Sequence, residues 1–193
     1  VFDSDEQLNA RMDNHNDEVG RVRAALRTRL RLATAPTRPH RAEGGQIAVD
    51  ARALQSPAFG NRGIGRFARA VLLAAREVTG DHRITLIVDS GLRPLPHELA
   101  GECKQVTRIT KDEVWQFGLF IEPSPMTHSA EPVIALLHSQ VHTVAVVFDF
   151  IPLHYPSIYL RDAASRAEYA ANLDALKLYK EYVCISDVAR SEL

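Results

Sequence analysis

The sequence predicts an α/β protein with a doubly wound, Rossmann-like parallel sheet, and two observations favour that fold class. Its apolar segments are short, rich in β-branched residues and apolar throughout, as in residues 143–148 (TVAVVF). Strands that are covered on both faces have this composition. The same segments alternate with stretches of helical periodicity, which is the pattern of repeated βαβ units.

A long helix is expected ahead of the sheet, at residues 4–34. Its apolar residues recur every three or four positions, which draws one stripe along a helix: Leu8, Met12, Val19, Val22, Leu26 and Leu30. Acidic residues crowd its first half and arginines its second, an order that matches the helix dipole. Prolines and glycines make residues 34–45 a linker. Residues 1–45 thus form a helix and linker, and self-association through residues 5–34 is one role open to the helix.

The domain itself is expected at residues 46–193 and opens with a strand at 46–50. A loop follows, and then a helix at 63–79 with an apolar inner face that Gly80 ends. The next elements are a buried strand at 83–88, a helix near 96–101 and a weak strand at 105–109.

The second half of the domain repeats the alternation of strands and helices. An apolar strand at 117–121 ends at Glu122, and residues 129–139 are expected to be helical before the strand at 143–148. Asp162 is suited to cap a helix that runs to about residue 180. A last strand is expected at 182–185, and Ser186 begins a final helix.

Composition and charge exclude several classes of protein. The chain has 193 residues, of which 46% are hydrophobic and 24% charged, enough for one well-packed domain. Its net charge of −1 gives no reason to expect nucleic acid as a partner. No apolar run approaches the roughly 20 residues of a membrane-spanning helix, and no signal peptide opens the chain. Cys103 and Cys184 lie far apart, which suits a reducing cytosol.

The ends of the chain suggest a longer protein. The sequence begins at Val1 and stops at Leu193, inside the final predicted helix. We therefore expect a further domain beyond it. The eight histidines show no metal-ligand spacing, and no G-x-S-x-G, Walker A or H-E-x-x-H motif occurs, so neither a metal nor a cofactor is expected.

The first candidate site residue is Asp149, directly after the strand at 143–148. Pro152 and Pro156 restrict the backbone before them, so we expect the chain to leave the sheet here as an irregular loop. Ligands of open α/β sheets bind at this carboxyl edge. A cap of the loop or of the following turn accounts for Asp149 equally well.

The second candidate site is the glycine-containing start of the helix at 63–79. Gly63 and Gly65 would let backbone N–H groups approach a phosphate at the positive end of the helix. The pattern Gly63-x-Gly65-x-x-Ala68, with Asp89 as a ribose partner, also fits a dinucleotide fingerprint. That fingerprint places its first glycine directly after the strand, whereas residues 51–62 intervene here. A sharp entry into a closely packed helix is the purely structural explanation of the glycines.

Four segments in order resemble a known family: DAR at 50–52, GIGRF at 63–67, FDFIPL at 148–153 and CISDVAR at 184–190. Retaining glycosyltransferases of family 4, with the GT-B fold, typically carry G-I-G-R-Y, H-D-L-I-P-L and I-S-x-x-[ST]-R in this order. The resemblance covers residues 46–193, which correspond to the N-terminal half of such enzymes. Two positions depart from the pattern: Phe148 stands in place of the family's histidine, and Phe67 in place of its tyrosine.

The resemblance implies two Rossmann-like domains facing across a cleft, of which this chain is the acceptor-side one. A C-terminal domain of the same protein would hold most of the donor contacts. Gly63, Gly65 and Arg66 would lie near the donor diphosphate, Asp149 would be the catalytic residue in the cleft, and Ser186 would begin the helix toward the hinge. The remaining cleft candidates, on the acceptor side, are Asn61, Arg62, Pro152 and His154.

The implied activity is a hexosyltransferase reaction in polysaccharide biosynthesis. The enzyme would move a sugar, with mannose as one candidate, from a nucleotide-sugar to a glycan or lipid-linked acceptor, without a metal or cofactor. It would act in the cytoplasm or peripherally on the inner face of a membrane, and this chain alone would be inactive. The alternatives are a dinucleotide-binding oxidoreductase domain and a non-catalytic interaction module.

Overall fold

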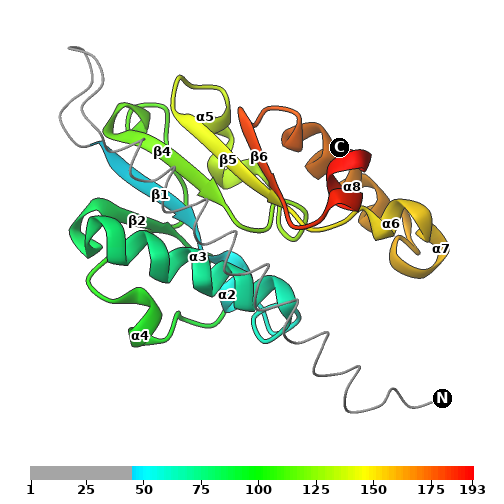
Figure 1. Ribbon diagram of the computed structural model, residues 1–193, viewed down its shortest axis with the longest axis horizontal. Coiled ribbons are helices and arrows are strands. Elements are labelled where there is room, and N and C mark those ends of the chain that lie inside the picture. The colour runs from blue at the N-terminus through cyan, green and yellow to red at the C-terminus, as the bar shows by residue number, and fades with distance from the viewer. Residues whose placement is uncertain (1–44) are drawn as a thin grey trace.

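The computed structural model describes residues 45–193, so the expected helix at 4–34 and its linker lie outside the described residues. The described chain forms a six-stranded sheet in which every strand pair is parallel, in the order β3-β2-β1-β4-β5-β6 (Figure 1). This is the strand order of Rossmann-like folds. The predicted α/β class and its Rossmann-like parallel sheet are confirmed.

The strands lie within two residues of their expected positions, except at the end of the third. They are β1 (Gln46–Asp50), β2 (Ile84–Ile87), β3 (Lys104–Val106), β4 (Phe117–Glu122), β5 (His142–Val147) and β6 (Glu181–Cys184). β3 is the weak strand of the sequence, and it stops at Val106 rather than at residue 109.

The helices follow the prediction where the sequence has a long periodic pattern. They are α2 (Arg52–Gln55), α3 (Gly63–Thr79), α4 (His97–Ala100), α5 (Ile134–Leu137), α6 (Ile151–His154), α7 (Pro156–Tyr159), α8 (Ala163–Leu176) and α9 (Asp187–Glu192), with short 3₁₀ turns at Asp81–Arg83, Val114–Gln116 and Glu131–Val133. α3 has the predicted bounds, and α8 ends at Leu176 rather than near residue 180. None of the described helices is long and apolar enough to cross a membrane.

The segment after β5 differs from the irregular loop that the sequence predicts. It contains the one-turn helices α6 and α7, and Pro152 and Pro156 lie in their first turns. A proline is tolerated there because the N–H group that it lacks would have no partner within the helix. The two prolines therefore begin short helices as well as ending the strand.

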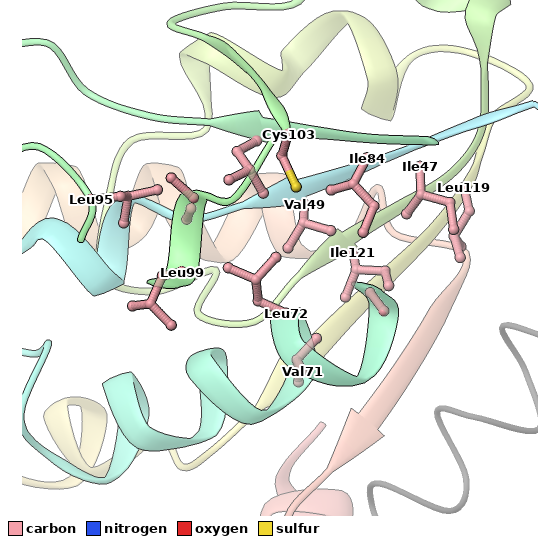
Figure 2. Packing of buried hydrophobic residues seen from close by; sticks show 14 of the residues in the cluster. Ile47, Val49, Val71, Leu72, Ile84, Leu95, Leu99, Cys103, Leu119 and Ile121 are labelled. Carbon is pink, nitrogen blue, oxygen red and sulfur yellow. The ribbon is translucent and has the colours of Figure 1, made fainter. Parts of the chain in front are cut away.

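Helices cover both faces of the sheet because side chains alternate along each strand. Ile47 and Val49 of β1 belong to the apolar cluster that packs against α3, and Ala48 between them belongs to a second cluster with α5 and α8. Figure 2 shows the first cluster, with Val71 and Leu72 of α3 facing the strand side chains. The core thus lies in two layers on either side of β1 and β4.

The sheet reverses its direction of growth between β1 and β4. From β1 the chain builds outward to β2 and β3, and it then returns to the other side of β1 to build β4, β5 and β6. The connections that leave β1 and β4 pack on opposite faces of the sheet. Such a reversal leaves a crevice at the carboxyl ends of the two strands, which is where ligands of this class of fold bind.

Replacing Phe120 with alanine should lower the free energy of unfolding by about 3–5 kcal/mol. Phe120 lies in β4 at the centre of the sheet with 0% of its surface exposed, so the change leaves a cavity. Urea unfolding measures the loss. Trp115, which is 75% exposed, is the matched control, and its alanine variant should change stability by less than about 0.5 kcal/mol. Equal losses in both variants would contradict the placement of Phe120 in the core.

Candidate functional site

A buried group of charged side chains lies at the carboxyl ends of β1 and β4. Asp50 ends β1 and Glu122 ends β4, and they follow directly on the paired residues Val49 and Ile121. Both carboxyl groups are buried, with exposed fractions of 1% and 3%. Arg52 donates from Nε and Nη2 to the Asp50 carboxylate at 2.6 to 3.1 Å.

Arg52 also forms a hydrogen bond with the connection that follows β4. Arg52 Nη1 donates to the backbone oxygen of Ser129, on the connection that follows β4, at 2.7 Å. The guanidinium group therefore ties the exit of β1 to the exit of β4. The ion pair compensates a charge on Asp50 that would otherwise be buried without a partner.

Glu122 has an unusual protonation behaviour as a result of this setting. Burial, and then the negative charge of Asp50, raise the pKa of Glu122 well above its ordinary value, against the opposing effect of Arg52. Glu122 accordingly keeps its proton at pH values at which an exposed glutamate has lost it. The position of Glu122 at the end of a buried strand was the available signal, equivalent to that of Asp149, but the sequence reasoning did not select it.

His128 lies near this group of charged side chains. Its ring meets Phe59 edge-on, with centroids 6.1 Å apart. Its Nε2 atom is buried and has no hydrogen-bond partner among the described residues, as is also true of Ser124 Oγ. Burial, partly offset by the charge of Asp50, lowers the pKa of His128, so the imidazole is neutral at neutral pH. No spacing in the sequence indicates this residue, because its neighbours Asp50, Arg52 and Phe59 lie about seventy or more positions away in the chain.

The N-terminus of α3 has no side-chain cap among the described residues. The N-cap residue Arg62 makes no capping hydrogen bond with its side chain, and the first turn has no acidic residue. No described residue accepts a hydrogen bond from the backbone N–H groups of Gly63 or Ile64. By contrast, Asp162 caps the N-terminus of α8 through a complete capping box. The positive end of α3 is thus left uncapped.

The two glycines of α3 differ in why they are needed. A Cβ atom at Gly65 would collide with the backbone carbonyl of Gly60, so this glycine is required for close packing of the preceding loop. A Cβ atom at Gly63 would meet nothing within 4 Å. The structural explanation therefore holds for Gly65, whereas packing gives no reason for a glycine at position 63.

The beginning of α3 lies against the end of β5. The rings of Phe67 and Phe148 are in edge-to-face contact, with centroids 5.4 Å apart and an interplanar angle of 84°. Two motifs that are far apart in the sequence therefore meet at one edge of the sheet. They meet through the two residues that depart from the family pattern.

The candidate residues beyond β5 have structural contacts of their own. Asp149 is exposed and its Oδ1 accepts a hydrogen bond from the Ile151 amide at 3.1 Å, which is the capping role that the sequence offered as an equal alternative. Ser186 Oγ accepts from the Ala189 amide at 3.1 Å and so caps α9. His154 Nε2 lies 2.8 Å from Glu192 Oε1. Pro152 is half-buried in α6.

The remaining candidates stand at the surface beside α3. Asn61, Arg62 and Arg66 are exposed. In the turn after β2, Asp89 Oδ1 accepts from the Gly91 amide at 2.8 Å, and the Asp89 amide donates to Gln55 Oε1 at 2.7 Å. These contacts hold the turn after β2. Nothing within residues 45–193 forms a group of three or more side chains able to hold a metal ion.

Comparisons with models of known families, with curated proteins and with solved structures found no match. The resemblance to family 4 glycosyltransferases therefore stays a prediction that rests on the four sequence segments. The structure itself establishes the α/β class and the Rossmann-like parallel sheet.

The variant Glu122→Gln should gain stability relative to the wild type as the pH rises. The unfolded wild-type chain releases the Glu122 proton near pH 4, while the folded chain keeps it, so wild-type stability falls as pH rises from there to the folded pKa. Glutamine does not titrate, and the variant escapes this loss, which is about 1.4 kcal/mol for each unit by which the pKa is raised. Urea unfolding of both proteins at acidic and neutral pH measures the difference.

Glu113→Gln provides the matched control. Hydrogen bonds from the Thr110 amide and hydroxyl lower the pKa of Glu113, so its contribution is present above the unfolded pKa and is lost as the pH falls. This variant should therefore show the opposite sign of pH dependence relative to the wild type. Parallel stability curves for wild type and Glu122→Gln would show that Glu122 is ionised in the folded protein.

Alanine substitutions at Gly63 and at Gly65 should have different effects on folding stability. Gly65→Ala is expected to lose about 1–3 kcal/mol of folding free energy, because its Cβ collides with the Gly60 backbone. Gly63→Ala should be neutral or more stable by up to about 1 kcal/mol, because the site is open and alanine restricts the unfolded chain. Urea midpoints of the two variants measure these effects, and a comparable loss at position 63 would refute the open environment.

Proposed function

We propose that this chain is the acceptor-side domain of a glycosyltransferase that uses a nucleotide-sugar donor, and that the N-terminus of α3 receives the donor diphosphate. The observation that carries the proposal is the uncapped helix end at Gly63, where packing does not call for a glycine. A glycine whose Cβ position is empty lets a ligand approach the backbone closely.

The chemistry of this helix end suits a diphosphate. The Gly63 and Ile64 N–H groups, which have no hydrogen-bond partner among residues 45–193, and the helix dipole favour a negative charge. The exposed guanidinium group of Arg66, in the fourth position of α3, can form charge-assisted hydrogen bonds with phosphate oxygens. In a retaining transfer, negative charge grows on the departing diphosphate, so fixed donors here would stabilise the transition state.

The arrangement around β5 supports the same proposal. The Phe67–Phe148 contact brings the beginning of α3 to the segment that carries Asp149, the proposed catalytic residue. In this proposal Asn61, Pro152 and His154 belong to the acceptor side, and Ser186 positions α9 by capping it. The donor's nucleotide would be held by a further domain, so the chain alone would be inactive. The acceptor would be a glycan or a lipid-linked sugar, reached in the cytoplasm or at the inner face of a membrane.

The oxidoreductase alternative has less support from the geometry. Its fingerprint requires a tight turn from strand to helix, whereas α2 and a further turn separate Asp50 from Gly63. The Asp89 carboxylate, its ribose partner, already accepts a hydrogen bond within its own turn. The interaction-module alternative depends on residues 5–34, outside the described residues, and a loss of self-association on deleting them would favour it.

Replacing Arg66 with alanine should weaken binding of GDP or UDP about tenfold, the effect of one charge-assisted hydrogen bond. Nuclear magnetic resonance is the suitable measurement, because the Gly63 and Ile64 amide signals should move as nucleotide is added even if binding is weak. Arg69→Ala is the matched control, since Arg69 is an equally exposed arginine on the same helix and lies beyond its first turn.

The outcomes of this titration separate the functions. Shifts at Gly63 with GDP or UDP, reproduced by inorganic pyrophosphate and weakened only by Arg66→Ala, support the proposed diphosphate site. Tight, saturable binding of NAD at the same amides would favour the oxidoreductase. If no nucleotide shifts the Gly63 amide signal, the helix end does not bind a diphosphate, and the transferase proposal fails.

A further inference from the structure

Polar side chains from four segments gather where β5 and β6 end. They are Asp149 after β5, His154 on α6, Tyr169 on α8 and Glu192 on α9. The 2.8 Å contact between His154 Nε2 and Glu192 Oε1 ties α6 to α9. Figure 1 shows α6, α8 and the C-terminal end of the chain grouped at this end of the sheet.

The hydroxyl group of Tyr169 lacks a hydrogen-bond partner in this group. Tyr169 is 8% exposed, and its Oη atom is buried without a partner among the described residues. Burial first, and then the negative charges of Asp149 and Glu192, raise its pKa to about 12, so the hydroxyl stays protonated and remains a donor at neutral pH. Native proteins rarely leave such a donor unpaired, since water or a ligand usually completes it.

The neighbours of this hydroxyl restrict what its partner can be. An anion would be repelled by Asp149 and Glu192, and a cation would give the phenol O–H no acceptor. A ligand hydroxyl satisfies both demands, because it accepts a hydrogen bond from Tyr169 and donates one to a carboxylate. His154 contacts Glu192 Oε1, and no hydrogen bond among residues 45–193 is seen at the second oxygen of that carboxylate, which can accept from such a donor.

Aromatic surface beside the group points to a sugar among hydroxyl-bearing ligands. Tyr155 and Tyr159, at the start and the end of α7, are 57% and 55% exposed. Exposed rings offer flat, partly apolar faces with a polar tip. A sugar matches this combination, because it presents apolar C–H faces between its hydroxyl groups.

We propose that Tyr169, together with Asp149 and the Glu192–His154 pair, forms a subsite for a hydroxyl group of the acceptor sugar. This inference rests on the proposed function and names the part of the carboxyl edge at which the acceptor is held. Tyr169 supplies the donor, the two carboxylates supply acceptors, and His154 fixes the orientation of Glu192.

Two tyrosine-to-phenylalanine variants of the whole chain test the proposal, because they should have opposite effects on stability and on sugar binding. Tyr169→Phe removes only the unpartnered hydroxyl, so it should leave stability unchanged or higher and weaken sugar binding about three- to tenfold, the effect of one neutral hydrogen bond. Tyr182→Phe is the control. Its hydroxyl donates to the Leu176 backbone oxygen at 2.9 Å, so this variant should lose stability and keep its sugar binding. The probes are mannobiose, maltose and lactose, followed by NMR titration, with urea unfolding for stability.

Three outcomes would each contradict the proposed subsite. Equal sugar binding by wild type and Tyr169→Phe would remove the hydroxyl from recognition, as would the absence of saturable binding of all three sugars. A loss of stability in Tyr169→Phe as large as that in Tyr182→Phe would show that a structural water pairs the hydroxyl. The GDP and UDP titration at Gly63 stays independent of these results, so the subsite can fail while the proposed function stands.

Discussion

The hydrogen bonds of Arg52 hold together the two halves of the sheet at the point where their connections diverge. One side of the guanidinium group pairs with Asp50 at the end of β1, and the other reaches the Ser129 carbonyl beyond β4. Removing one partner of such a buried ion pair typically costs about 3–5 kcal/mol. Arg52 is buried near the carboxyl ends of β1 and β4, where this class of fold usually binds its ligand. The exposed candidate side chains lie to either side, at the beginning of α3 and beyond β5.

Local patterns in the sequence predicted most of the fold. Runs such as residues 143–148 give strands because β-branched residues suit a sheet that is buried on both faces. The long helix α3 follows from its apolar periodicity and from Gly80 at its end. The sequence did not indicate α6 and α7, because a single helical turn leaves no periodic pattern and proline is read as a helix breaker.

The candidate site was predicted less completely, because its contacts join residues that are distant in the sequence. The significance of Glu122 depends on β4 lying beside β1, which strand order decides and composition does not. The Phe67–Phe148 contact likewise joins the beginning of α3 to the residue after β5, which are about eighty positions apart in the sequence. No local pattern in the sequence predicts that these two rings meet.

The strand order also has a consequence for how the chain folds. All neighbouring strands are parallel, so none of them can form a hairpin, and each strand pair has to close a loop that contains a crossover. The pairing of Val49 with Ile121 closes about seventy residues of chain, and such non-local contacts slow folding. The hydrogen bond from Arg52 to Ser129 spans nearly the same length of chain, so it too is a non-local contact. Closing that length of chain costs conformational entropy before either contact stabilises the fold.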